Sequence, residues 1–294
     1  MAAGHYPVLL KESLEYLAIR PEGIYVDATA GLGGHAGAIV RRLDTGFLIA
    51  CDRDAESLEM ARANTADAAG RIRFFHGSFS RLAEALAENG VEAVDGVLAD
   101  LGVSRYQLSS GERGFSLMED GPLDMRMDRS QELTASELVN QLPEKSLADL
   151  IYELGEERRS RRIARALVRA RPILTTGRLA EVVETAVPRT GRLHPATQTF
   201  MALRLKVNAE LEELGELLRI APERLKTGGR LVVVTFMSLE DRRVKQRFQE
   251  LARAGQARIL TKHVVRPEEE EIRENPASRS AKLRAIQRVS EPGA

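Results

Sequence analysis

Short apolar runs alternate with longer segments of helical spacing over the first third of the chain. The predicted strands cover residues 24–26, 47–50, 72–75 and 94–99, and the predicted helices cover residues 36–43, 55–68 and 79–89. Strands separated by helices of this length imply crossover connections, which are right-handed in nearly all proteins. The pattern therefore predicts an α/β fold with a mostly parallel, doubly wound sheet.

The pattern changes after residue 102. Residues 103–135 are rich in Gly, Ser, Asp and Met and have no clear period, and residues 146–206 have the spacing of helices. The α/β pattern then returns, with a helix at 209–225, a turn at 227–229, a strand at 231–236, a helix at 239–254 and final strands at 259–265 and 283–289. We therefore expect one α/β domain, residues 1–102 and 208–294, interrupted by a mainly helical inserted domain, residues 103–207.

Length and composition narrow the class of protein. Of the 294 residues, 43% are apolar and 29% are charged, which is typical of a soluble globular protein and excludes a disordered chain. No apolar run approaches the roughly 18 residues that a membrane helix needs, and the N-terminus has no apolar signal core, so we expect a cytoplasmic protein. The single cysteine excludes a disulfide scaffold, and the five scattered histidines predict no metal site.

The net charge of zero excludes a protein coated in basic charge, but the charge is unevenly distributed. Residues 158–206 contain twelve Lys and Arg against two Glu, a net charge of +10 in 49 residues. Arg158, Arg162, Arg165 and Arg169 recur at the spacing of one helix face. This asymmetry predicts a surface that binds phosphate, with a merely solvated helix face as the alternative. The 8 Phe, 5 Tyr and absent Trp make a surface built on base stacking unlikely to be the main one.

A glycine-rich loop follows the first predicted strand. Gly31, Gly33 and Ala36 match the dinucleotide-binding pattern, and Asp52 follows Gly31 by 21 residues, where such sites place an acid on a ribose. Glycines permit positive φ and close approach of a ligand to the backbone. A tight turn without a ligand is the alternative for the loop alone. The combination of this loop with the helix after it, the second strand and the acid at the end of that strand favours a cofactor that contains adenosine.

Acidic residues end three of the predicted strands: Asp27, Asp52 and Asp100. Ligands of open α/β sheets bind at this edge. Asp27, directly before the loop, is a poor neighbour for phosphate and suits a cationic ligand, and the chain has no P-loop motif. These observations favour S-adenosylmethionine, which has an ammonium, a sulfonium and a ribose but no phosphate. A nicotinamide nucleotide, and thus an NAD-dependent oxidoreductase, is the alternative.

A set of specific motifs occurs in a fixed order along the chain. They read HYPVLLKE, DATAGLGGHA, HGSF, VLADLGVS, RGFS, GPLDMRMD, GEERRSRRIARA, HPATQTFMALRLKVN and FMSLEDR. From His5 to about Val289 the chain resembles the bacterial small-subunit ribosomal RNA cytosine-N4 methyltransferases, family H. The resemblance implies a class I S-adenosylmethionine-dependent fold with an inserted substrate-recognition domain. It also implies methylation of the exocyclic amine of a cytidine in the decoding region, in small-subunit ribosomal RNA or an assembling subunit.

The resemblance also implies site residues. The family's cofactor contacts fall on Gly33, Gly34, His35, Asp52, Phe79, Asp100 and Gln107. The sequence departs from the family at Met237, where a histidine is usual, and at Arg105 and Tyr106, where Ser-Pro is common. The change at Met237 makes an RNA-binding ribosome assembly factor with a vestigial cofactor site a second alternative. The oligomeric state stays open.

The chemistry of the target constrains the catalytic groups. Cytosine N4 is a poor nucleophile that needs an acceptor for an N–H, and carboxylates suit that donor. Asp100 is a candidate for serving the cofactor, the amine or both, and the acting base stays open. His35 could contact the cofactor, order the loop or transfer a proton. Methylation at C5 would need a thiolate, and Cys51 lies within a predicted strand, where a buried apolar role is expected.

Contacts with the substrate are expected in the inserted domain. Asp124, Arg126 and Asp128 are candidates for contacts with the base or the backbone, with an internal ion pair as the alternative. Arg162 and Arg165 are candidates for contacts with RNA phosphate.

Overall fold

The computed structural model describes residues 7–189, 191 and 193–290, so His5, where the resemblance begins, lies outside it. The chain divides into two compact units. One unit combines Met1–Gly102 with Glu212–Ala294, and the other consists of Val103–Leu211. Each unit has its own apolar core, and each is described by itself below.

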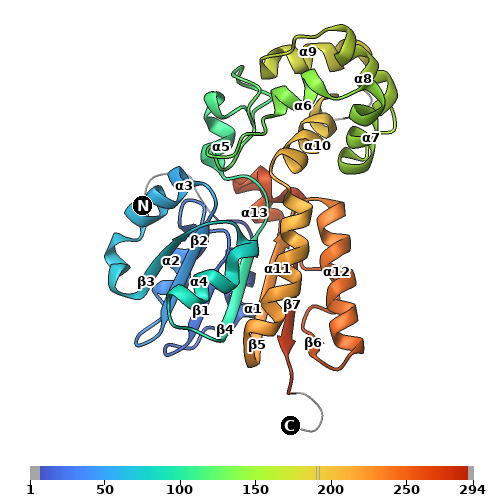
Figure 1. Ribbon diagram of the computed structural model, residues 1–294. Coiled ribbons are helices and arrows are strands. Elements are labelled where there is room, and N and C mark those ends of the chain that lie inside the picture. Colours follow the sequence, from blue (N-terminus) through green and yellow to red (C-terminus); the bar gives the residue numbers. More distant parts are fainter. Residues whose placement is uncertain (1–6, 190, 192, 291–294) are drawn as a thin grey trace. The chain divides into compact units, whose positions relative to one another are not determined.

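The first unit is built on a seven-stranded sheet with the order β3-β2-β1-β4-β5-β7-β6 (Figure 1). Its strands are β1 (Ile24–Asp27), β2 (Phe47–Asp52), β3 (Ile72–His76), β4 (Val94–Asp100), β5 (Leu225–Thr235), β6 (Ala257–Ile259) and β7 (Lys282–Arg288). Strands β1 to β5 are parallel, and β7 is antiparallel to β5 and to β6. The predicted fold class, a mostly parallel α/β sheet, is confirmed.

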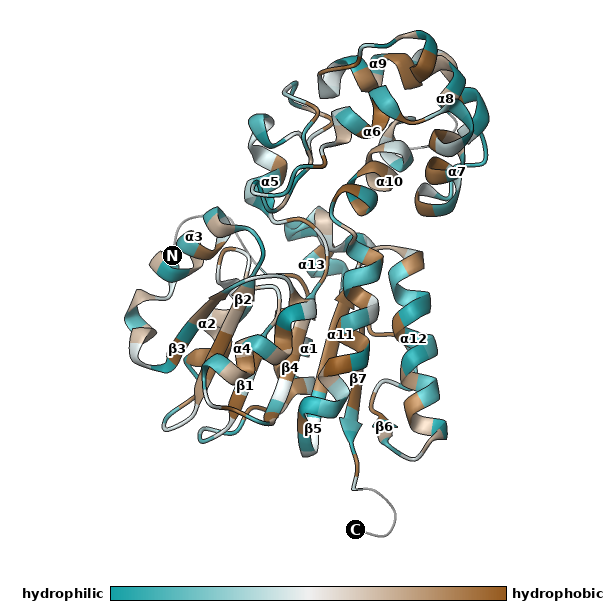
Figure 2. Ribbon diagram, in the orientation of Figure 1, coloured by the Kyte–Doolittle hydropathy of each residue, from teal (hydrophilic) through white to brown (hydrophobic). Residues whose placement is uncertain are grey.

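Helices cover both faces of this sheet, as expected of a doubly wound fold. One face packs against α1 (Leu10–Leu17), α2 (Gly34–Val40) and α3 (Ala55–Asn64), and the other against α4 (Leu82–Glu88), α11 (Glu210–Arg224) and α12 (Ser238–Arg253). Alternation along β2 divides its side chains between the two cores, with Leu48 and Ala50 on one face and Ile49 and Cys51 on the other. The central strands β1, β2 and β4 are mainly apolar (Figure 2) and are buried over almost their whole length, as strands covered on both faces are.

Three local features differ from the sequence-based predictions. The strand predicted at 259–265 is wrong, because β6 ends at Ile259 and only Val265 forms a further, isolated bridge to β7. The pairing ends because the hydroxyl of Thr261 takes the place of the backbone and accepts the N–H of Ala285. The turn predicted at 227–229 is an irregularity inside β5, with Gly228 at φ +82°. Helices α1 and α13 (Glu269–Glu274) were not among the expected elements.

The second unit is mainly helical. Its helices are α5 (Arg105–Ser109), α6 (Ala135–Gln141), α7 (Glu144–Gly155), α8 (Ser160–Arg169), α9 (Thr176–Ala186) and α10 (Thr197–Val207). Helices α6 to α10 surround a core that includes Leu147, Ile163, Leu179 and Leu203, all buried. Helices α6 to α9 bury apolar residues against this core and leave most polar residues at least partly exposed, whereas α10 is buried along most of its length.

Candidate active site

Three carboxylates lie at the carboxyl edge of the sheet in the first unit. Asp27 and Asp100 end β1 and β4, the neighbouring strands between which the strand order reverses, and Asp52 ends β2 on the other side of β1. In open α/β sheets this reversal opens the crevice in which ligands bind. The structure therefore brings the predicted strand-end acids to one edge of the sheet.

Asp52 shapes the glycine-rich loop. Its Oδ2 accepts the N–H of Gly31 at 2.7 Å, and its Oδ1 accepts the N–H of Asp54 at 2.8 Å. Burial raises the pKa of Asp52 to about 6, against the effect of these two hydrogen bonds. Gly33 adopts φ +85°, and a Cβ there would lie 3.1 Å from the Cα of Ala61. Glycine is thus required at position 33, for conformation and for space.

Asp27 is completely buried below the loop. Its Oδ1 accepts the N–H of Thr29 at 3.1 Å, and its Oδ2 has no hydrogen-bond partner among the described residues. Burial raises the pKa of Asp27 to about 7, with the nearby charge of Asp52 adding to the effect. A buried carboxylate with an unused oxygen is costly unless a further group completes its hydrogen bonds.

Asp100 lies beside His35 of α2. The two side chains approach to 3.6 Å, between Oδ2 of Asp100 and Nδ1 of His35. Burial raises the pKa of Asp100 well above its usual value, and the charges of Asp27, Glu240 and Glu271 raise it further. The second oxygen, Oδ1, is buried and has no hydrogen-bond partner within the described part of the chain.

The segment just before α1 lies against the same loop. A Cβ at Gly34 would lie 2.5 Å from Cγ of Pro7, so this proline packs directly on the loop glycine. Nε2 of His35 is 3.1 Å from the carbonyl oxygen of Val8, and the N–H of Leu9 donates to Glu271 of α13 at 2.8 Å. Each of the residues 7–9 therefore makes a contact that fixes this segment in place, two with the loop and α2 and one with α13.

These residues suit a ligand with positive charge and hydroxyl groups. The two unused oxygens, on Asp27 and Asp100, can accept hydrogen bonds, and a bound cation would favour the ionised form of both carboxyl groups, whereas a phosphate would oppose it. Asp52 at the end of β2 retains acceptor capacity for ribose hydroxyls. S-Adenosylmethionine has this combination of groups, so the three carboxyl groups fit S-adenosylmethionine. They do not fit a pyrophosphate.

Two further predicted cofactor contacts lie in different units. Phe79 begins a short 3₁₀ turn (Phe79–Arg81) in the first unit and is half-buried against its core. The preceding Gly77 donates its N–H to the carbonyl of Asp52 at 2.9 Å, which places this turn beside the end of β2. Gln107 lies in the second unit, where its side chain accepts the N–H of Ser104 at 2.8 Å as part of a helix cap. Its role with the cofactor stays a prediction.

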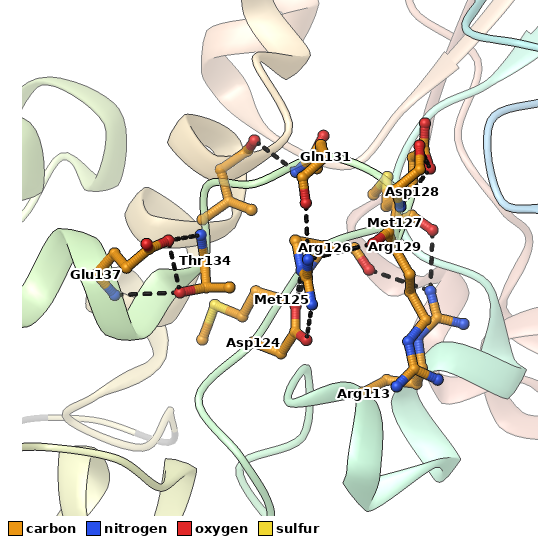
Figure 3. Close-up of polar contacts among 12 residues, drawn as sticks. Arg113, Asp124, Met125, Arg126, Met127, Asp128, Arg129, Gln131, Thr134 and Glu137 are labelled. Atoms are coloured by element: carbon orange, nitrogen blue, oxygen red, sulfur yellow. Dashed lines mark hydrogen bonds and ion pairs between the residues drawn. The ribbon is translucent and has the colours of Figure 1, made fainter.

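The GPLDMRMD loop forms a closed polar network within the second unit (Figure 3). Arg126 donates to both oxygens of Asp124, at 2.7 and 2.8 Å, and these hydrogen bonds lower the pKa of Asp124 although burial alone would raise it. Asp128 accepts the backbone N–H and the hydroxyl of Ser130. All three side chains make bonds within the loop, so substrate contact by them stays a prediction.

Two residues that support this loop were missed by the sequence reasoning. Arg113 is 2% exposed and donates to the carbonyls of Arg126 and Met127. Asn208, also buried, donates to the carbonyl of Met125 and accepts the N–H of Met127, both at 2.8 Å. Met125 itself has φ +63°, a conformation that costs free energy without such support. No local pattern in the sequence signals these contacts, which join residues up to 83 positions apart.

Basic side chains line the outer face of α8. Arg161, Arg162, Arg165 and Arg169 are exposed, whereas Ile163, Ala164 and Leu167 are buried. Arg158 precedes the helix, which begins at Ser160, so the predicted membership of Arg158 in this helix face is wrong. Arg165 forms an ion pair with Glu144 at 3.4 Å, and both of these side chains are exposed. Such a pair contributes little, so the face is available to an anion.

Glu240 and Glu271 were also missed as neighbours of the candidate site. Glu240 accepts the N–H groups of Phe236 and Met237 at the start of α12, so this helix is capped although methionine replaces the usual histidine. A Glu three residues after a helix start is a recognisable capping signal. Glu271 lies in an acidic run with no comparable signal.

Neither a metal site nor a membrane span is found in residues 7–290, with 190 and 192 left aside. No group of three or more His, Cys, Asp or Glu side chains in that part is arranged to hold a metal ion. None of the helices there is both long and apolar enough to cross a bilayer.

Comparisons with known proteins extend over nearly the whole chain. The model of the MraW methylase family matches residues 2–289. A protein from Solibacter usitatus named ribosomal RNA small subunit methyltransferase H is 64% identical, over 96% of this chain and 99% of the relative. A protein of the same name from Koribacter versatilis is 51% identical, over 97% of this chain and 94% of the relative. A solved rRNA methylase from Streptococcus thermophilus is 12% identical, over 96% of this chain and 94% of that chain, with a TM-score of 0.46.

Proposed function

The chain belongs to the MraW methylase family, and from this premise we propose that it methylates a cytidine of small-subunit ribosomal RNA at the exocyclic N4, with S-adenosylmethionine as the donor. The observation that carries the proposal is the set of three carboxylates at the strand ends, two of which keep an unused oxygen. The relatives reported above are named ribosomal RNA small subunit methyltransferase H. The position of the cytidine in the decoding region, and action in the cytoplasm, follow from the resemblance.

Each carboxylate has a separate task in this proposal. Asp52 accepts the ribose hydroxyls, Asp27 faces the positive charge of the methionine part, and Asp100 serves the target amine. Bound S-adenosylmethionine supplies an electrophilic methyl group on sulfur. The protein aligns the amine with that methyl group, and alignment of two reactants contributes several kcal/mol to lowering a barrier.

The two alternatives fit less well. A nicotinamide dinucleotide would place its pyrophosphate beside Asp27, which is buried and carries an unused oxygen. An assembly factor with a vestigial pocket would be expected where substitution had damaged the site. Met237 leaves the start of α12 capped by Glu240, so the departure from the family does not disrupt this edge of the fold.

The test is methyl transfer from labelled S-adenosylmethionine to small ribosomal subunits and to the naked RNA, followed by mass spectrometry of the nucleosides. N4-Methylcytidine is expected, and its absence from both substrates would refute the proposal. A matched pair of variants links the reaction to the site. Asp52→Ala should weaken cofactor binding at least about tenfold, because removal of a charged hydrogen-bond partner costs roughly 1.5–3 kcal/mol.

The control for that variant is Asp67→Ala, which removes an exposed carboxylate paired with Arg41 at the surface. Calorimetry should show unchanged affinity for this variant. Equal affinity of both variants and the wild type would remove Asp52 from the site.

A further inference from the structure

His35 lies between two oxygen atoms of the first unit. Its Nε2 is 3.1 Å from the carbonyl oxygen of Val8, and its Nδ1 is 3.6 Å from Oδ2 of Asp100. A carbonyl oxygen can only accept a hydrogen bond, so Nε2 carries a hydrogen. The contact with Val8 therefore fixes which nitrogen of the ring faces Asp100.

The contact between Nδ1 of His35 and Oδ2 of Asp100 is longer than a hydrogen bond, and it is favourable only when one of the two groups holds a proton there. Without that proton, the lone pair of Nδ1 would face the carboxylate directly, which is unfavourable in a buried site. Two arrangements satisfy the contact: an imidazolium beside a carboxylate, or a neutral imidazole beside a carboxylic acid that is protonated on Oδ2. In both arrangements the other oxygen, Oδ1, has no hydrogen.

Oδ1 of Asp100 is the buried oxygen that lacks a hydrogen-bond partner in the described part of the chain. We infer that His35 is a positioning residue that keeps Oδ1 of Asp100 a hydrogen-bond acceptor for the N–H of the target amine. The inference rests on the proposed function and adds to it the means by which the acceptor is maintained.

The surroundings of Asp100 make such a device necessary. Asp27 from β1, Glu240 from α12 and Glu271 from α13 all act on this carboxyl group and, with burial, raise its pKa. A carboxyl group in this environment tends to hold a proton at neutral pH. On Oδ1 that proton would turn the acceptor into a donor, and His35 directs it to Oδ2 instead.

The pair also accounts for the proton that the reaction releases. The N4 nitrogen forms its bond to the methyl carbon as the sulfur–carbon bond breaks, and the electron pair of that bond stays on sulfur. N4 then loses one proton to Oδ1. If Oδ2 was protonated, its proton moves to Nδ1, so that the pair holds two protons instead of one. One of these leaves to water before the next turnover.

The position of His35 depends in turn on the segment before α1. Val8 supplies the carbonyl, Pro7 packs on Gly34 beside it, and Leu9 is fixed by Glu271. These contacts hold the carbonyl of Val8 in place, and through it the ring of His35.

Nitrogen NMR of the cofactor-free protein tests the pair without any reaction. We expect a hydrogen on Nε2 of His35 in the wild type, and an unprotonated Nδ1 in Asp100→Asn. His76 is the matched control, because its Nε2 also lies 3.1 Å from a backbone carbonyl, that of Arg53. The resonances of His76 should not change. A hydrogen on Nδ1 with none on Nε2, or an Nδ1 that stays protonated in Asp100→Asn, would overturn the inference.

The pH dependence of turnover tests the functional part. In His35→Asn the proton of Asp100 is free to settle on Oδ1, so kcat should fall at least about tenfold at neutral pH and recover as the pH rises and Asp100 ionises. His76→Asn should keep the wild-type profile. A loss in His35→Asn that is the same at every pH indicates a purely structural role and refutes the inference. Absence of methyl transfer by the wild type would instead refute the proposed function, and this inference with it.

Discussion

Asp27 makes the stability of the protein depend on pH. The unfolded chain releases this proton near pH 4, about the ordinary value for aspartate, whereas the folded protein holds it up to about pH 7. Because the pKa is raised in the folded state, the stability associated with this group is complete below about pH 4 and is lost as the pH rises through about 7. Asp27→Asn should therefore raise the melting temperature at about pH 8 by at least about 3 °C, which corresponds to about 1 kcal/mol.

Scanning calorimetry at about pH 4 and about pH 8 checks this expectation, and the difference from the wild type should nearly vanish at the lower pH. Asp67→Asn, an exposed position, should have no such effect. A melting temperature that Asp27→Asn lowers equally at both pH values would show that the effect of this side chain on stability does not depend on its ionisation, contrary to the expectation.

The thiol of Cys51 should be dispensable. The side chain is 2% exposed within β2, and burial raises its pKa, so that it is not a thiolate at neutral pH. We expect Cys51→Ala to retain methyl transfer within a few-fold. The measurement is the rate on small-subunit RNA together with a search for a covalent protein–RNA adduct. A trapped thioether, or loss of activity in folded Cys51→Ala, would favour methylation at C5 over N4.

The candidate site was only partly accessible from sequence. Asp52 and Asp100 were predictable because an acid at the end of a buried run marks the ligand edge of such a sheet. The partners of these acids were not, because Glu271 reaches Leu9 across 262 residues of sequence and His35 meets Asp100 only through packing of α2. Contacts of this kind depend on tertiary structure and leave no periodic signal.

At the scale of elements, α8 is the candidate RNA-binding surface. Its buried face consists of Ile163, Ala164 and Leu167, so charge reversal on the opposite face should not disturb packing. We expect Arg162→Glu with Arg165→Glu to weaken RNA binding strongly. The slope of the logarithm of the binding constant against the logarithm of the salt concentration should decrease in magnitude by about 0.7 to 0.9 for each phosphate that the variant no longer binds. Filter binding across a series of salt concentrations measures both effects.

A double variant with the same change in charge, Arg219→Glu with Arg253→Glu, is the control. These exposed residues lie on α11 and α12 in the other unit. Affinity for S-adenosylmethionine should be unchanged in both proteins. Equal RNA binding by the α8 variant and this control would mean that the arginines of α8 serve only as a solvated face.

Some helices and strands were predictable from the sequence and others were not. The strands β1, β2 and β4 were predicted because central parallel strands are buried on both faces and form continuous apolar runs in the sequence. The edge strand β6 was not, because only Ala257–Ile259 pair before the side chain of Thr261 replaces the backbone in the ladder. Helix α1 is preceded by Leu9 in the left-handed conformation, which no residue type there indicates.

At the scale of the whole molecule, the predicted cofactor contacts lie mainly in one of the two units. Of the predicted contacts, all except Gln107 lie in the unit that combines Met1–Gly102 and Glu212–Ala294. A ligand that binds the folded state stabilises the region it contacts. Hydrogen–deuterium exchange with S-adenosylhomocysteine should therefore show protection of residues 27–36, 52–54 and 77–82. NAD should give no protection of these residues. Protection by S-adenosylhomocysteine that is confined to α7–α9 would show that the cofactor binds in the other unit.

The position of β7 has a consequence for synthesis of the chain. This strand is the last in sequence, yet it lies between β5 and β6 and is hydrogen-bonded to both. The unit Val103–Leu211 is complete in the nascent chain before any residue of β5 has been made, whereas the sheet of the other unit stays open until Lys282–Arg288 leaves the ribosome. Domains tend to fold as units during translation. We therefore expect the unit Val103–Leu211 to fold before the sheet of the other unit is complete.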